Sequence, residues 1–120
     1  MGDALGITVR REHGFAIASV AGEIDISTVG QLREHLFELA DGGEQLIVDL
    51  ERITFIDSAG LGALIGASRR AAANGGSLQA ICAGPQTRRL LWLTGVDRRI
   101  PLSDSLDGAL ASAGASGGIG

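Results

Sequence analysis

The stretch Ile53-Thr-Phe-Ile-Asp-Ser-Ala-Gly-Leu-Gly62 changes character halfway along its length. An apolar approach ends at the adjacent pair Asp57 and Ser58, and a segment rich in Ala and Leu continues to Ala73. A β-strand that leads directly into a helix accounts for this change, because an acid and a hydroxyl are typical helix-start residues. Three glycines interrupt the helical segment: Gly60, Gly62 and Gly66. Each lowers helix propensity by about 1 kcal/mol, which indicates that something approaches the backbone closely.

The same alternation of strand and helix signals extends in both directions from this stretch. Strands are expected at residues 7–12, 15–21, 46–50, 78–83 and 100–102, and helices at residues 29–41, 59–73, 86–94 and 104–113. His13-Gly14 joins the first two strands as a hairpin turn, and Gly22 ends the second strand. The alternation requires crossover connections and predicts an α/β domain with a mostly parallel central sheet of about five strands and about four helices. The domain is assigned to residues 1–113, and residues 114–120 are expected to form a flexible tail.

Local patterns give three further expectations about single residues. Thr28 and Gln31 fit a capping box at the start of the first helix. Trp92, the sole tryptophan, is expected in the core. Cys82 lies in an apolar run and is expected to be a buried strand residue, and a single cysteine allows no internal disulfide.

The overall charge and hydropathy exclude two classes of partner. The net charge is −4 and the isoelectric point is near 5.0, which argues against nucleic acid, since phosphate neutralisation needs a basic face. The N-terminus lacks the pattern of a signal peptide, and no apolar run approaches the roughly 20 residues of a membrane span. A cytoplasmic location is therefore expected.

Catalytic roles for Ser58 find little support in the sequence. A nucleophilic serine needs a neighbouring base, but the only histidines are His13, in the predicted turn, and His35, in the first helix. One cysteine and two isolated histidines do not make a metal site. The chain has no lysine, and Ile65 stands where a dinucleotide-binding motif would need glycine, so only weak nucleotide contact stays open. No cofactor is expected.

Two readings of Asp57 and Ser58 remain, and they are compatible. Either side chain can cap the following helix, a contribution of roughly 1 kcal/mol. Ser58 is also well placed for a phosphate, because a helix N-terminus carries unpaired N–H groups and a partial positive charge. Phosphorylation would add about −1.5 to −2 charges and would change the surface that a partner meets.

The order of these motifs resembles the STAS domain, and most closely the anti-sigma factor antagonists of that family. The resemblance is carried by Gly22-Glu-Ile-Asp25, Leu46-Ile-Val-Asp-Leu50, Phe55-Ile-Asp-Ser-Ala-Gly-Leu61 and Leu93-Thr-Gly-Val-Asp97. It covers residues 7–113. The Asp-Ser-Ala-Gly-Leu signature is more specific for the domain than for any one of its functions.

The resemblance implies a partner-switching mechanism in transcription regulation under stress. Such antagonists bind an anti-sigma factor that is also a serine kinase with a histidine-kinase-like ATPase fold, and thereby release a sigma factor. The kinase would phosphorylate Ser58, the phosphoprotein would no longer bind, and a metal-dependent serine phosphatase would reset it. The chain is then a binding module and not an enzyme. The implied contact residues are Asp25, Asp57, Ser58, Ala59, Gly60, Leu61 and Gly62.

Other functions within the family stay open from the sequence. Asp25 could be only a turn or capping acid. The domain could be an accessory subunit of an ATP-driven lipid transporter, which docks on an ATPase without a phosphate switch. It could also be a nucleotide-binding sensory module, whereas an anion carrier as a whole is excluded because no spanning segment is present.

Overall fold

The computed structural model describes residues 4–119, with side chains described as far as residue 112. Its strands are β1 (Gly6–Glu12), β2 (Phe15–Ile24), β3 (Gln45–Ile56), β4 (Ser77–Ile81) and β5 (Leu102–Ser103). Its helices are α1 (Val29–Asp41), α2 (Ser58–Ala73), α3 (Pro85–Leu93), the short 3-10 helix η1 (Val96–Arg98) and α4 (Leu106–Ile119). This arrangement confirms the predicted α/β class, with four α-helices and a five-stranded sheet.

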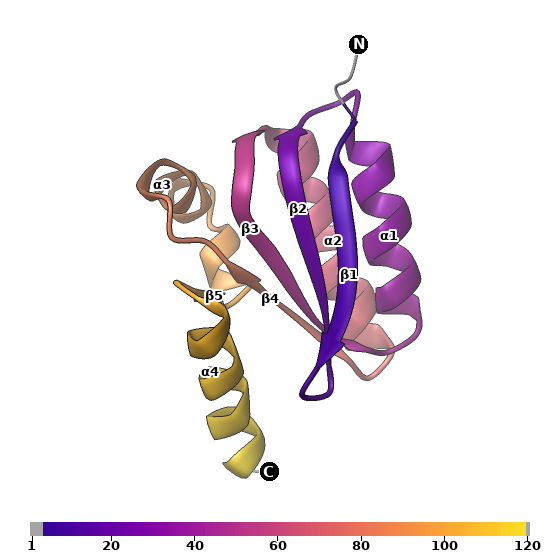
Figure 1. The fold of residues 1–120 in the computed structure, drawn as a ribbon, viewed down its shortest axis with the longest axis vertical. Coiled ribbons are helices and arrows are strands. Elements are labelled where there is room, and N and C mark those ends of the chain that lie inside the picture. The colour runs from indigo at the N-terminus through magenta and orange to yellow at the C-terminus, as the bar shows by residue number, and fades with distance from the viewer. Residues whose placement is uncertain (1–3, 120) are drawn as a thin grey trace.

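The five strands form one sheet in the order β1-β2-β3-β4-β5 (Figure 1). Only the β1–β2 pair is antiparallel, and the other three pairs are parallel. His13 (φ 52°) and Gly14 (φ 83°) both adopt positive φ and close the β1–β2 hairpin, as predicted. Because β2, β3 and β4 run in parallel, the loops that follow them leave the sheet at the same edge.

Helices α1 and α2 cover one face of β1–β3 and enclose the main core (Figure 1). Fully buried members of this core come from both layers and include Leu32, Leu36, Leu46, Val48 and Leu64. A smaller cluster on the other face joins Phe15, Ile17, Ile47 and Ile81 to Ala109 of α4. Helix α4 therefore covers only part of that second face.

Two strands are longer than the sequence predicts. Strand β2 continues through Gly22 to Ile24, and β3 continues past residue 50 to Ile56. The pairing register of β2 and β3 shifts between Ser19 and Ala21 and again between Gly22 and Glu23, where Gly22 takes a φ of +109°. Both extra residues lie in β3, where such bulges break the alternation of apolar and polar residues, so the pattern predicted too early an end for that strand. Strand β2 was expected to end at Gly22 because glycine weakens a strand, but it continues through that residue.

The prediction that Trp92 belongs to the core is wrong. Its side chain is 63% exposed, and the neighbouring Leu93 is 60% exposed. Helix α3 buries Leu91 fully, and a residue one position further along a helix points about 100° away. A short helix with one buried position thus leaves its aromatic residue at the surface.

The C-terminal helix is longer than expected. Helix α4 was predicted to end near residue 113, but its backbone stays helical to Ile119, so the proposed tail lies mostly within it. Residues 106–119 contain no proline that would stop the helix, and alanines favour its continuation. The mobility predicted for residues 114–119 stays a prediction, and Gly120 lies outside the described residues. Within the described residues, no helix is both long and apolar enough to cross a membrane.

Cys82 is buried as predicted, with 1% of its surface exposed, but it lies directly after β4 and not within the strand. Burial raises the pKa of the Cys82 thiol above its ordinary value, so little thiolate forms at neutral pH. The folded chain is therefore expected to resist labelling by a maleimide at pH 7, while the chain unfolded in guanidinium reacts fully. Rapid stoichiometric labelling of the native chain would show that the thiol is accessible.

Candidate functional site

The predicted site residues gather where β2 and β3 end side by side. Ile24 and Ile56 are paired in the parallel register, and the Asp57 N–H donates to the Ile24 carbonyl at 3.1 Å. Asp25 directly follows β2, and Ser58 follows β3 after Asp57. The structure therefore brings Asp25 to the same edge of the sheet as Asp57 and Ser58, although more than 30 residues separate Asp25 from this pair in the sequence.

Asp57, and not Ser58, caps helix α2. Its backbone is extended (φ −110°, ψ −171°), and its Oδ1 accepts from the N–H groups of Ala59 at 2.9 Å and Gly60 at 3.2 Å. This is the geometry of an N-cap acid, and it satisfies two of the otherwise unpaired donors of the first turn. The prediction that one residue of this pair caps the helix is therefore confirmed, and that residue is Asp57.

Ser58 occupies the first helical position, and its side chain is exposed. No hydrogen bond of its hydroxyl is found among the side chains of residues 4–112. Because the Asp57 side chain already accepts from the N–H groups of Ala59 and Gly60, the Ser58 hydroxyl is not used as the cap of α2. It projects to solvent from a rigid helix start.

Close packing explains why α2 has glycine at position 60 although glycine lowers helix propensity. A Cβ at this position would lie 2.6 Å from Cγ2 of Ile24 and 2.7 Å from Cγ1 of Ile56. Only glycine lets the first turn of α2 approach the ends of β2 and β3 so closely. Further along α2, a Cβ at Gly66 would meet the Phe37 ring of α1 at 3.2 Å, while one at Gly62 would meet nothing within 4 Å.

The other predicted contact residues divide into two groups. Gly60 and Leu61 are buried, so they position the helix and do not offer a side chain to a partner. Ala59 is half-buried, and Gly62 is exposed. Ser58 and Gly62 are thus the members of this helical turn that a partner can reach most directly.

Asp25 closes the turn between β2 and α1. Its Oδ1 accepts from the Ser27 hydroxyl at 2.7 Å, the Ser27 N–H at 2.9 Å and the Thr28 N–H at 3.1 Å. These bonds, foremost the one from the Ser27 hydroxyl, hold the pKa of Asp25 below its ordinary value. Asp25 therefore has a turn-forming role whatever else it does.

The predicted capping box at Thr28 and Gln31 is wrong. Thr28 has a helical backbone (φ −110°, ψ −15°) and makes no side-chain cap bond. Its hydroxyl instead donates to the Glu23 carbonyl at 2.7 Å and accepts from the Asp25 N–H at 3.0 Å, while Gln31 Oε1 accepts from the Leu5 N–H at 3.2 Å. The turn on Asp25 brings the chain into α1 with Thr28 already helical, so its side chain faces β2.

Two apolar side chains at this edge were missed from the sequence. Ile26, next to Asp25, is 81% exposed, and Phe55, two residues before Asp57, is 49% exposed. An isoleucine inside the polar turn Asp25-Ile-Ser-Thr28 has no structural reason to be there, and that mismatch was the available signal. Together, Ile26 and Phe55 add an apolar component to an otherwise acidic edge.

The two histidines lie away from Ser58. His13 sits in the β1–β2 hairpin turn, at the opposite end of β2 from Asp25. His35 is exposed on α1, with Nδ1 at 2.9 Å from the Gln31 carbonyl oxygen. Among the described side chains, neither histidine makes a hydrogen bond to the Ser58 hydroxyl.

Comparisons with known proteins agree with this architecture. The family model described as "STAS domain" matches residues 6–109. The anti-sigma-F factor antagonist RsfB of Mycobacterium tuberculosis is 34% identical over 111 residues, which cover 90% of this chain and 88% of RsfB. The anti-sigma-B factor antagonist of Bacillus subtilis is 30% identical over 106 residues, which cover 88% of this chain and 97% of that protein. The crystal structure of an anti-sigma factor antagonist from Mycobacterium paratuberculosis superimposes with a TM-score of 0.85 at 31% identity, covering 93% of this chain and 96% of that one.

Proposed function

Because the chain belongs to the STAS domain family, we propose that it is an anti-sigma factor antagonist controlled by phosphorylation of Ser58. In this proposal it binds an anti-sigma factor that is also a serine kinase, and so releases a sigma factor. The chain itself is a substrate and binding module, not a catalyst. A serine phosphatase returns the phosphorylated form to the binding state.

The observation that carries the proposal is the exposed Ser58 hydroxyl without a structural partner. A serine that capped α2 would be tied to the backbone, but Asp57 makes those bonds instead. The hydroxyl is presented at a fixed position by a helix start packed tightly through Gly60. This arrangement suits a residue that a kinase modifies without disturbing the fold.

A phosphate on Ser58 would change the surface and leave the domain folded. The N–H donors of Ala59 and Gly60 are already held by Asp57, so the phosphate has few backbone partners and stays exposed. It adds charge beside two carboxylates, Asp25 and Asp57. A partner that packs over this edge would then have to bury an unpaired charge, which costs on the order of 2–5 kcal/mol of binding energy.

Ile26 and Phe55 supply the apolar contact that such an interface needs. Interfaces concentrate their energy in a few large side chains, whereas the acidic residues around them contribute mainly to specificity. Ile26 is almost fully available for contact, and it lies one residue from Asp25. The binding surface thus combines an apolar anchor, acids and a modifiable hydroxyl.

Ile26→Ala is expected to lower the affinity for the anti-sigma factor about tenfold, because it removes a large exposed side chain from the proposed interface. The measurement is a binding isotherm with the purified partner. Leu93→Ala is the matched control, since Leu93 is 60% exposed but lies on α3. Equal losses in the two variants would argue against an interface centred on the β2 and β3 edge.

The test of the proposal is recovery of the partner followed by a phosphorylation assay. The chain is used as bait in native lysate, and the recovered proteins are identified by mass spectrometry. The purified partner is then incubated with the chain, ATP and Mg²⁺, and the phosphate is mapped, with Ser58→Ala as the control. A kinase-type ATPase that modifies Ser58 and nothing in the control is the expected result. Recovery of a transporter ATPase instead, or a phosphate on another residue, would contradict the proposal.

A further inference from the structure

A second polar surface lies on the sheet face opposite α1 and α2. In Figure 1 those helices lie behind β1, β2 and β3, and the front face of the three strands carries no helix. The apolar part of this face, around Ile17 and Ile47, packs against Ala109 of α4. The remaining part forms a shallow pocket of about 350 Å³, whose polar lining residues are Thr8, Arg10, Ser19, Asp49 and Arg52.

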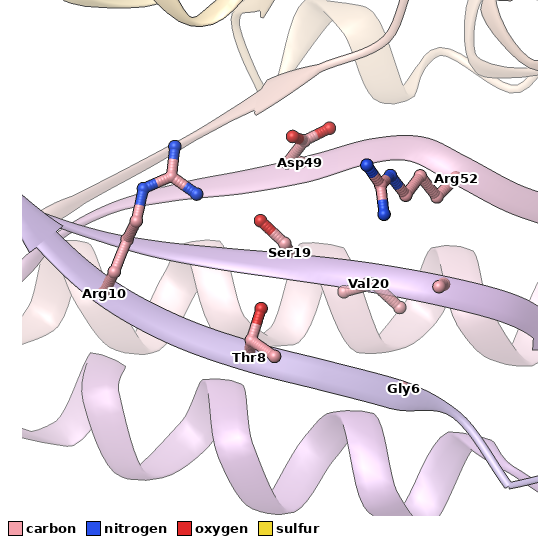
Figure 2. A pocket seen from close by; sticks show the side chains of 8 residues that line it. Gly6, Thr8, Arg10, Ser19, Val20, Asp49 and Arg52 are labelled. Atoms are coloured by element: carbon pink, nitrogen blue, oxygen red, sulfur yellow. The ribbon is translucent and has the colours of Figure 1, made fainter.

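The strand register assembles these side chains from three strands. Thr8 pairs with Ser19, and Ser19 pairs with Asp49, so one row of polar groups crosses β1, β2 and β3. Arg10 lies on one side of this row, and Arg52 lies on the other (Figure 2). Two guanidinium groups therefore flank a row of two hydroxyls and one carboxylate.

Arg52 reaches this face only because of a β-bulge. Asp49 and Arg52 are three residues apart, and strict alternation would place them on opposite faces. Between the pairs Ser19–Asp49 and Ala21–Arg52, β3 advances by three residues while β2 advances by two. The extra residue turns Arg52 back to the face of Asp49, and bulges of this kind often re-aim a side chain at a functional position.

The two arginines differ in how they are held. Arg10 donates from Nε to Glu12 at 2.5 Å, which leaves its terminal nitrogens available and fixes the direction of the group. Arg52 forms no ion pair with any side chain of residues 4–112, whereas Arg11, Arg70 and Arg88 are each paired with a carboxylate. Glu12 offsets the charge of Arg10, so Arg52 is the arginine of the lining that no carboxylate among the described side chains pairs.

We infer that this pocket binds a small phosphate ester whose organic part carries hydroxyl groups. Arg52, which no carboxylate among the described side chains pairs, holds the phosphate by charge-assisted hydrogen bonds at one end of the row, and the hydroxyls of Thr8 and Ser19 and the terminal nitrogens of Arg10 donate to other oxygens of the ligand. Asp49 cannot face the phosphate without repulsion, so it accepts from the ligand's hydroxyl groups, and this favours an ester over a bare anion. The pocket volume lies at the small end of the range for ligand sites. The site is separate from Ser58, so it would let the domain sense a metabolite independently of its phosphorylation.

The test uses ribose 5-phosphate as the probe, titrated into the ¹⁵N-labelled chain and followed by amide chemical shifts. Saturable shifts at the central residues of β1, β2 and β3 are expected, with affinity at least about tenfold above that for inorganic phosphate or ribose alone. Arg52→Gln is expected to weaken binding about tenfold or more, while Arg33→Gln, an equal charge change on exposed α1, leaves it unchanged. Thermal melts establish that both variants are folded.

Three results would overturn the inference. The first is no saturable shift on these strands, and the second is equal weakening by Arg52→Gln and Arg33→Gln. The third is inorganic phosphate that binds as tightly as the ester, because Asp49 would then have no ligand group to hold.

Discussion

Ser58→Glu is expected to lower the affinity for the anti-sigma factor by roughly 30-fold to several thousand-fold, equivalent to about 2–5 kcal/mol. The glutamate places a fixed negative charge at the exposed first position of α2, beside Asp25 and Asp57. In the complex this charge would be buried without a partner, since Asp57 already takes the Ala59 and Gly60 N–H groups. A single glutamate carries less charge than a phosphate, so phosphorylation itself should produce the larger loss.

Ser58→Ala is the control that separates charge from the loss of the hydroxyl. Since Ser58 makes no cap bond, this variant should lose well under 1 kcal/mol of stability and should bind within a few-fold of the parent chain. Calorimetric titration of both variants with the purified partner measures the difference directly. Comparable affinity of the Glu and Ala variants would contradict the proposal that charge at Ser58 controls binding. Unfolding of the Ala variant would show that Ser58 is structural.

The general architecture could be predicted because its signals are local. Short apolar runs separated by capped helical segments predict an α/β sheet, and the positive-φ turn at His13-Gly14 follows from its residues. The meeting of Asp25 with Asp57 and Ser58 also follows, because parallel neighbouring strands end at one edge. What the sequence could not provide was the register between β2 and β3, where the first of two shifts turns Arg52 to the outer face.

The caps of the two helices at the site depend on competition between local partners, which residue types alone do not decide. Thr28 has the residue type of a cap, but Asp25 closes the turn first and changes the backbone at Thr28. Both Asp57 and Ser58 could have capped α2, and only the extended backbone of Asp57 determines which one does. The exposure of Ile26 and Trp92 depends on which neighbouring element covers them, and that is tertiary information.

Gly60→Ala is expected to destabilise the fold by about 2 kcal/mol, the largest stability effect predicted at the site. Alanine improves helix propensity by about 1 kcal/mol, but overpacking costs about 3 kcal/mol when rigid neighbours cannot move away. The new methyl would meet Ile24 and Ile56 at 2.6 and 2.7 Å, and both are buried, β-branched side chains fixed on strands. The first turn of α2 would have to move outward, and Ser58 would move with it.

Gly62→Ala provides the matched comparison, because it makes the same substitution two residues later in the same helix. A methyl at Gly62 meets nothing within 4 Å, so only the gain in helix propensity remains, and stability should rise by about 0.5–1 kcal/mol. Chemical denaturation should therefore give changes in the free energy of unfolding of opposite sign for the two variants. In thermal melts, the melting temperature of Gly60→Ala should lie below that of the parent chain by on the order of 8 °C. Equal stability of the two variants would mean that the Ile24 and Ile56 side chains move aside at little cost when a methyl group is added at position 60. In that case Gly60 would not be what fixes the position of Ser58, and the rigid presentation of its hydroxyl would need another source.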